Sequence, residues 1–141
     1  MTNTEKRIGW WIACNESRKL DYGDNRIARV GVTHSVTGKP ECCNNGLHAS
    51  ERLVDALYYG NTNKIYRVEV WGDIHEQDDK LCGTHRRYIG YLDGETVLRK
   101  FARQQALINI EKIKPYCSEK DYRVIVTYLK TGRNRSAAWS A

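Results

Sequence analysis

The pattern of apolar residues changes once along this chain, close to residue 95. Before that point, short runs of alternating apolar and polar side chains lie between turn-forming residues, which is typical of strands with one buried face. After it, apolar side chains recur every three or four residues, which is typical of amphipathic helices. The change predicts an α+β fold, with an N-terminal antiparallel β-rich core that includes one short helix, followed by two C-terminal basic helices.

The β-rich part is expected to contain four strands, at residues 10–13, 27–32, 64–74 and 86–92. Turn-forming residues stand at 21–25, 37–40 and 93–94. The short helix is predicted to begin at Ser50, because a serine hydroxyl can accept hydrogen bonds from the free amides of the first turn. It should end near Tyr59, and its apolar face consists of Leu53, Ala56 and Leu57.

Two helices are expected in the remainder of the chain. The first covers residues 96–113, ends before Pro115, and directs an apolar stripe inward, formed by Val97, Leu98, Phe101, Ala102, Ile108 and Ile110. The second begins after Ser118 and ends at Gly132. A chain of 141 residues has the usual size of one domain. We therefore predict a single domain over residues 1–141, with a β-rich part at about 9–95, a helical part at about 96–132 and a short flexible C-terminal tail at 133–141.

Positive charge is concentrated in the helical part. Residues 96–141 contain ten lysines and arginines against three acidic residues, whereas residues 1–95 contain thirteen against fourteen. Such a field attracts nucleic acid, anionic ligands or an acidic protein surface. No recognition-helix or RNA-binding fingerprint accompanies it, so sequence-specific DNA binding is not expected. The candidate partner-binding residues are Arg99, Lys100, Arg103, Lys112, Lys114, Arg123 and Lys130.

The cysteines and the N-terminus indicate a cytoplasmic protein. Only a short apolar patch, residues 8–13, follows the N-terminal residues, so neither a signal peptide nor a membrane span is predicted. Five cysteines without regular spacing fit reduced thiols better than a disulfide framework.

Metal binding and thiol catalysis are both weakly indicated. The metal-ligand candidates are Cys42, Cys43 and His48, with His34, Cys82 or His85. Because no Cys-x-x-Cys or His-x-x-x-His pair is present, we predict no metal site and interpret these thiols as buried. Nucleophilic catalysis would need Cys43 or Cys14 as the thiolate, with His34 or His48 as its base. Any chain with this many cysteines and histidines offers such pairs, so the sequence does not favour this chemistry.

The Gly-Leu-His-Ala-Ser motif at residues 46–50 carries a resemblance to enzymes. It is followed by a helix with Ala56 and Tyr59 and by a strand at residues 65–70, an order that resembles the second motif of ADP-ribosyltransferases. The resemblance implies NAD as cofactor, a pocket lined by His48 and Tyr59, and Glu69 as a substitute carboxylate. Residues 10–13 lack the histidine or arginine of that family, and residues 83–88 lack its glutamate. The catalytic set is therefore incomplete, and an enzyme is not the favoured interpretation.

A second resemblance covers more of the chain. The motifs at residues 31–36, 40–43, 46–50, 78–80 and 98–103 together resemble an uncharacterised family of phage and prophage proteins, whose members often end in long alanine- and tryptophan-rich tails. Residues 135–141 look like a shortened tail of this kind.

The phage resemblance implies a protein that acts in the cytoplasm of a bacterial host by binding a host protein or ribonucleoprotein complex. The favoured hypothesis is a phage-encoded accessory protein that needs no cofactor and blocks part of an antiviral defence, such as CRISPR-type immunity, or of a nucleic-acid-processing complex. The alternatives are an ADP-ribosyltransferase-like enzyme that modifies a host target with NAD, and a non-specific nucleic-acid-binding protein.

Overall fold

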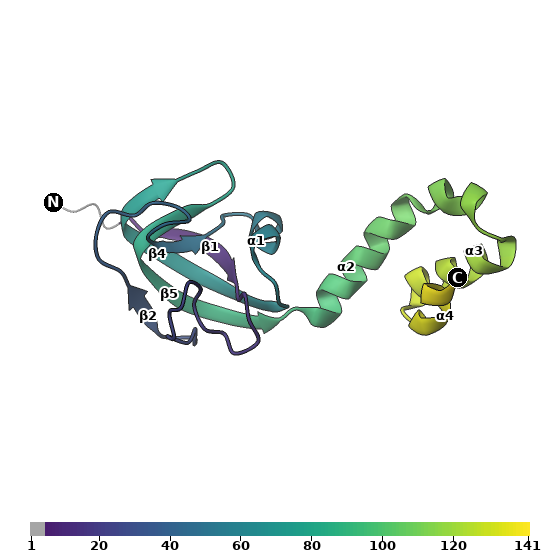
Figure 1. The fold of residues 1–141 in the computed structure, drawn as a ribbon, viewed down its shortest axis with the longest axis horizontal. Coiled ribbons are helices and arrows are strands. Elements are labelled where there is room, and N and C mark those ends of the chain that lie inside the picture. The colour runs from purple at the N-terminus through teal and green to yellow at the C-terminus, as the bar shows by residue number, and fades with distance from the viewer. Residues whose placement is uncertain (1–4) are drawn as a thin grey trace. The chain divides into compact units, whose positions relative to one another are not determined.

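The computed structural model describes residues 5–141 and divides them into two compact units, with the boundary between Gly94 and Glu95 (Figure 1). We call residues 5–94 the β unit and residues 95–141 the helical unit. The boundary falls where the apolar pattern changes, and the α+β class is confirmed. Among the described residues, no helix combines the length and the apolar character that crossing a membrane requires.

The β unit is one antiparallel sheet with a short helix. Its strands are β1 (Arg7–Ile12), β2 (Thr33–Ser35), β3 (Leu47–Ala49), β4 (Lys64–Glu76) and β5 (Leu81–Asp93), and its helix is α1 (Leu53–Tyr59). The strand order is β1-β4-β5-β2, and β3 also pairs with β5. β4 and β5 form a long hairpin, while β2 and β3 lie one after the other along β5.

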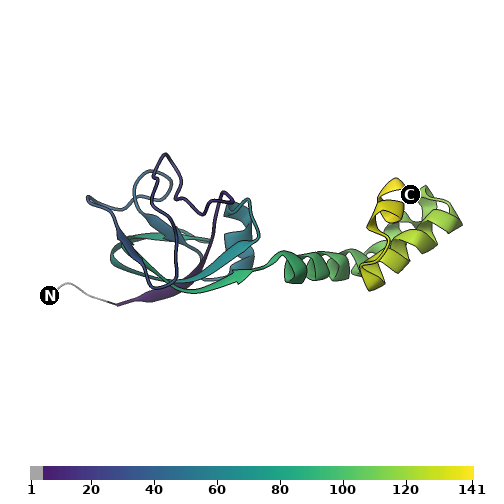
Figure 2. The ribbon, with the colours of Figure 1, turned by 90° about the horizontal axis from the view of Figure 1, so that it is seen from below.

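The sheet curves until its two edges meet (Figure 2). Trp10 in β1 exchanges two backbone hydrogen bonds with Ser50, the residue after β3, at N–O distances of 2.7 and 2.9 Å. Gly9 allows this approach, because a Cβ at that position would lie 2.9 Å from the Ser50 carbonyl oxygen. Closing the sheet in this way pairs backbone groups that an open edge would leave exposed.

The core lies inside this curved sheet. Tyr66, Val68 and Val70 alternate along β4 toward the interior, as the sequence pattern predicts, and none is more than 1% exposed. Trp11 and Tyr88 pack against Tyr66, with ring centroids 5.5 and 5.4 Å from it. Aromatic rings thus fill much of the interior, and this accounts for part of the aromatic content of the sequence.

Three predictions for the β unit are wrong in detail. Residues 27–32 do not form a strand; Ile27 makes only an isolated bridge, and the strand in this region is Thr33–Ser35. Helix α1 begins at Leu53 rather than after Ser50, because the backbone of Ser50 is paired with β1. The strand predicted at 86–92 extends from Leu81 to Asp93, since the hairpin with β4 continues past the bulges in the ladder.

The helical unit contains α2 (Glu95–Ile108), a 3-10 helix η1 (Ile110–Tyr116), α3 (Glu119–Thr131) and α4 (Arg135–Ser140). The predicted boundaries of α3 are confirmed. The Ser118 hydroxyl accepts a hydrogen bond from the Asp121 amide, and Gly132 adopts the left-handed conformation with φ of 72°. α3 and α4 lie side by side in both views (Figures 1 and 2).

The rest of this unit differs from the prediction. α2 ends at Ile108, and Pro115 lies within η1 instead of ending a long helix. The residues of the expected inward stripe are not buried, and indeed no residue between 95 and 141 is. The predicted flexible tail at 133–141 contains α4, so this unit has three α-helices rather than two.

Candidate functional site

A small pocket of about 120 Å³ lies in the β unit, where the end of β1, β3 and α1 meet. It brings together side chains from segments far apart in the sequence, among them Trp10, Asp21, Cys43, His48, Tyr59 and Lys80. His48 and Tyr59 are therefore brought together, as the resemblance to ADP-ribosyltransferases implies. The volume corresponds to a single small ring rather than to a drug-sized ligand.

His48 is held as a neutral imidazole. Its Nε2 accepts a hydrogen bond from the backbone N–H of Cys43 at 2.9 Å, so the ring proton is on Nδ1. Burial, followed by the positive charges of Arg86 and Lys80, lowers the pKa of His48 to about 4. At neutral pH this side chain can donate a hydrogen bond, but it is poorly matched to act as a general acid or base.

Tyr59 belongs to a charged cluster at the mouth of the pocket. Its hydroxyl donates to the carboxylate of Asp79, and the ammonium group of Lys80 lies 4.5 Å from the centre of its ring. The hydrogen bond to Asp79 raises the pKa of Tyr59. The ring is thus fixed by one carboxylate and one cation, both from the β4–β5 turn.

The two thiols at this pocket differ in character. The Cys14 thiol donates a hydrogen bond to Asp21 at 2.9 Å, and burial, followed by this bond, raises the pKa of Cys14 to about 12. Cys43 is exposed, adopts φ of 73°, and lies with its sulfur 2.9 Å from Lys80 Nζ. The candidate thiol–histidine pairs, which the sequence did not favour, do not form: the His48 imidazole bonds to the Cys43 amide, and the His34 imidazole bonds to the Tyr88 hydroxyl.

The third residue implied by the resemblance, Glu69, does not belong to this pocket. It lies on β4, and its carboxylate forms an ion pair with Lys6 at 3.1 Å. Asp21 is the carboxylate that does line the pocket. The assignment of Glu69 to the site is therefore wrong.

Sequence reasoning missed a buried arginine behind His48. Arg86 is 2% exposed; its guanidinium donates to the His48 carbonyl oxygen at 2.6 Å and to the Tyr88 hydroxyl at 2.8 Å. The Tyr88 hydroxyl is also 2.9 Å from Nδ1 of His34. Arg86 forms no ion pair with any described residue, and its charge is instead placed 4.3 Å from the Trp11 ring centre. The sequence shows that Arg86 lies in a predicted strand, but it does not show which residues the side chain contacts.

The predicted partner-binding residues fall into three groups. Arg99, Lys114 and Arg123 form ion pairs with acidic residues three or four positions away in sequence. Lys100, Lys112 and Lys130 are exposed and form no ion pair with a described residue. Arg103 is different, because its guanidinium packs against Gly132 at the C-terminal end of α3. Arg103 is therefore a packing residue of the helical unit and is not available as a free surface charge.

Two of the candidate metal ligands, His34 and His85, have other partners in the fold. His34 bonds to Tyr88, and His85 stacks on Trp71 with an interplanar angle of 15°. Cys42 and Cys82 do come together, and they do so beside His75, which the sequence analysis did not select.

Residues 16–100 match the protein family described as a domain of unknown function, DUF7666. Because the match covers more than half of the chain, the chain belongs to this family. No curated protein and no solved structure matches it. The matched range contains most of the pocket and ends at Lys100, so most of the helical unit lies outside it.

Proposed function

We propose that this DUF7666 member is a binding protein that contacts an acidic protein partner through its helical unit. The proposal rests on one observation: the helical unit has no buried residue, yet it carries the whole net charge of the chain and an exposed apolar face. A segment of this kind is typical of surfaces that are completed by a partner.

The charge separates sharply between the two units. Residues 95–141 contain ten basic and four acidic residues, whereas residues 1–94 contain thirteen of each, so the formal charge of +6 belongs to the helical unit. Lys100, Lys112 and Lys130 have no acidic partner among the described residues. A negatively charged partner would supply the missing counter-charges and would speed association.

The apolar side chains of α2 favour a protein over a nucleic acid. Val97, Phe101 and Ile108 are 52%, 50% and 73% exposed. Their spacing of four and seven residues places them on the same side of α2, next to Lys100. Phosphate binding requires no such apolar face, whereas an amphipathic helix docks with its apolar side in a groove of a protein.

The resemblance of the sequence motifs to phage and prophage proteins supports a more specific version of this proposal. In that version the partner is a component of the bacterial host, either of an antiviral defence or of a nucleic-acid-processing complex, and the chain blocks it by occupying its surface. No catalytic step is required of the chain.

Two variants test the proposal in affinity capture from bacterial lysate, with the captured protein then purified for affinity measurement. In the first, Lys100, Lys112 and Lys130 are changed to Glu; in the second, Val97, Phe101 and Ile108 are changed to Ser. Both should weaken binding by about tenfold or more, since truncating a hot-spot residue of an interface costs about 2 kcal/mol or more. The matched control changes three exposed cations of the β unit to Glu, namely Arg29, Lys39 and Arg87.

The control variant should bind as the parent does. If the control and the charge variant lose the same amount of affinity, the helical unit is not the contact surface. Binding that survives the serine variant but falls steeply with salt, and that nucleic acid competes away, would instead favour the non-specific nucleic-acid binder.

A second candidate function rests on the pocket, because His48 and Tyr59 line it together. In this alternative the pocket holds the nicotinamide ring of NAD, and Asp21 takes the place of the absent glutamate. The test is NAD binding and ADP-ribose transfer with Tyr59→Ala, compared with Tyr58→Ala as the control. Tyr58 is 84% exposed and does not line the pocket. Loss of NAD binding and transfer in the Tyr59 variant, but not in the Tyr58 variant, would support this alternative. Absence of NAD binding by the parent protein would exclude it.

A further inference from the structure

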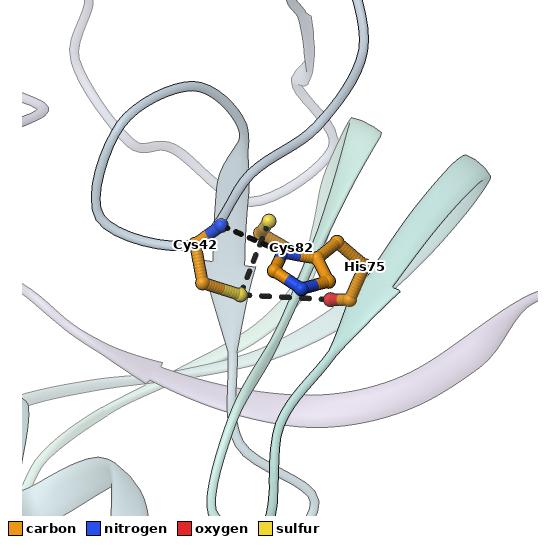
Figure 3. Close-up of side chains that lie close together, drawn as sticks. All are labelled: Cys42, His75 and Cys82. Atoms are coloured by element: carbon orange, nitrogen blue, oxygen red, sulfur yellow. Dashed lines mark hydrogen bonds between the residues drawn. The ribbon is translucent and has the colours of Figure 1, made fainter.

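Three potential metal ligands converge at one end of the β unit (Figure 3). Cys42 stands in the loop before β3, His75 near the end of β4, and Cys82 near the start of β5. His75 and Cys82 are direct partners in the β4–β5 ladder, so their side chains lie next to each other on one face of the sheet. Cys42 reaches the same point from the loop, and in Figure 3 the three side chains point toward one another.

The distances suit a single small ion. The sulfur atoms of Cys42 and Cys82 are 3.2 Å apart, and one donor atom of each of the three residues lies within 4.8 Å of the others. Tetrahedral zinc, with bonds of roughly 2.3 Å to sulfur and 2.0–2.1 Å to nitrogen, separates two sulfurs by roughly 3.8 Å and a sulfur from a nitrogen by roughly 3.5 Å. Small side-chain movements would therefore be enough to admit the ion.

The environment fits a site rather than three unrelated side chains. Cys42 and Cys82 are 7% and 0% exposed, and His75 is half-buried. The imidazole is already oriented, because its Nδ1 accepts a hydrogen bond from the Cys42 backbone N–H at 3.0 Å. The Nδ1 lone pair therefore points toward Cys42, and a metal ion could take the place of that N–H.

We propose that Cys42, His75 and Cys82 form a zinc-binding site, a function that goes beyond the proposed partner binding. Two thiolates and one imidazole are ligands that zinc accepts readily, whereas calcium and magnesium prefer oxygen. On binding, each thiol releases its proton to the solvent and the imidazole coordinates in its neutral form. His75 also lines an open hollow together with Glu41 and Asp73, so the fourth position can be filled from the solvent side.

Zinc bound there would tie the loop before β3 to the β4–β5 hairpin. The contacts between them near Cys42 and Cys82 include, besides the His75–amide bond, the approach of the Cys42 sulfur to the His75 carbonyl oxygen at 3.5 Å and of the Cys82 sulfur to the Asn45 carbonyl oxygen at 3.8 Å. Because the loop continues into β3, which contributes His48 to the pocket, the ion would have a structural role beside the candidate site.

The test is a metal titration of the reduced full-length protein after removal of metal with a chelator. Co²⁺ is the first probe, because thiolate ligation and tetrahedral geometry give it characteristic absorption bands, and Zn²⁺ should then displace it. We expect one ion per chain with thiolate-to-cobalt charge transfer. A folded, reduced chain that shows no such bands and retains no zinc would overturn the proposal.

Two variants and one control locate the site. His75→Gln is the sharper variant, because a half-buried residue close to a hairpin end can be replaced without emptying the core. The affinity for Zn²⁺ should fall by about 100-fold or more, since losing even an outer partner of a ligand costs roughly 10–100-fold. Cys42→Ser should reduce the charge-transfer intensity. The control is Cys117→Ser, which removes a half-buried thiol from the helical unit and should bind as the parent does. Unchanged affinity in His75→Gln, or equal loss in the control, would contradict the assignment.

The mass of the protein isolated without reductant separates zinc from a disulfide. One zinc ion per chain in the native mass spectrum supports the site. A peptide that links Cys42 to Cys82 with the loss of two hydrogen atoms, combined with no metal binding by the reduced protein, would show that the two thiols form a disulfide instead.

Discussion

The two units of this chain differ in how much apolar surface they bury. The β unit buries aromatic and aliphatic side chains inside a sheet whose edges meet at Trp10 and Ser50. The helical unit has three short α-helices and no buried residue. Burial of apolar surface is the main favourable term in folding, and short helices are marginal in water without it. From this difference we infer that the β unit is stable by itself, whereas the stability of the helical unit depends on contacts with other surfaces.

The largest effect should come from separating the two units. A fragment of residues 1–94 should keep the circular dichroism spectrum of a folded sheet and unfold cooperatively in urea. A fragment of residues 95–141 should lose most of its helicity, because helices of 14 residues or fewer gain little from their own hydrogen bonds. Cooperative thermal unfolding of the helical fragment would contradict the inference that this unit is not stable by itself.

The same substitution placed in each unit should have very different effects. Leu81→Ala removes a side chain that is 1% exposed in the core and should lower the free energy of unfolding by about 2–5 kcal/mol. Leu107→Ala, in α2, removes a half-buried side chain and should cost less than about 1 kcal/mol. Urea denaturation followed by fluorescence and circular dichroism measures both. Equal losses would mean that the helical unit has a core of its own.

The buried polar network of the β unit should make its stability depend on pH. Burial, followed by the charges of Arg26 and Arg86, lowers the pKa of His34 below its usual value. Below the unfolded pKa of about 6.5, the unfolded chain then binds a proton more readily than the folded chain. Stability should be fully present above that pH and decline as the pH falls toward the folded pKa.

The variant His34→Gln isolates this contribution, because Gln can still bond to the Tyr88 hydroxyl but does not titrate. We expect the slope of unfolding free energy between pH 6.5 and 5 to be smaller in the variant than in the parent. Identical slopes, measured by urea denaturation at each pH, would show that His34 does not carry the dependence.

The smallest effect concerns a helix cap. Ser118→Ala removes the hydroxyl that accepts from the Asp121 amide and should destabilise α3 by about 1 kcal/mol. Ser136→Ala is the control, because Ser136 lies inside α4 and its alanine variant should match or slightly exceed the parent in helicity. A thermal unfolding curve followed by far-UV circular dichroism compares the two. A similar loss in both variants would show that the cap contributes nothing specific.

Local patterns were enough to predict the elements whose signals are local. The alternation along β4 reports one buried face, and the Ser118 and Gly132 ends of α3 follow from the chemistry of single residues. The burial of α2 could not be predicted, because an amphipathic pattern shows which face is apolar but not whether anything covers it. Val97 and Phe101 therefore matched the pattern of a core and are nevertheless about half exposed.

In the candidate site, too, the residues with local sequence signals were predicted and those defined by long-range contacts were not. The motif at residues 46–50 pointed to His48, and the helix after it to Tyr59, because both are linked by short sequence distances. Glu69 was wrongly included, and Arg86 and His75 were missed. The neighbours of these three residues depend on how β4 pairs with β5, and those of His75 also on a loop more than thirty residues before it in the sequence. Neither kind of contact produces a recognisable spacing of residues in the sequence.

The sequence by itself determined the α+β class, the change from strands to helices near residue 95 and the concentration of positive charge after it, because these depend on periodicity and composition along the chain. Tertiary structure decided which side chains meet. The closure of the sheet at Ser50, the burial of Arg86 without a counter-charge from the part of the chain that is described, and the approach of Cys42 to His75 and Cys82 all depend on strand register and loop path. Register is fixed by long-range packing, and no local stretch of residues contains that information.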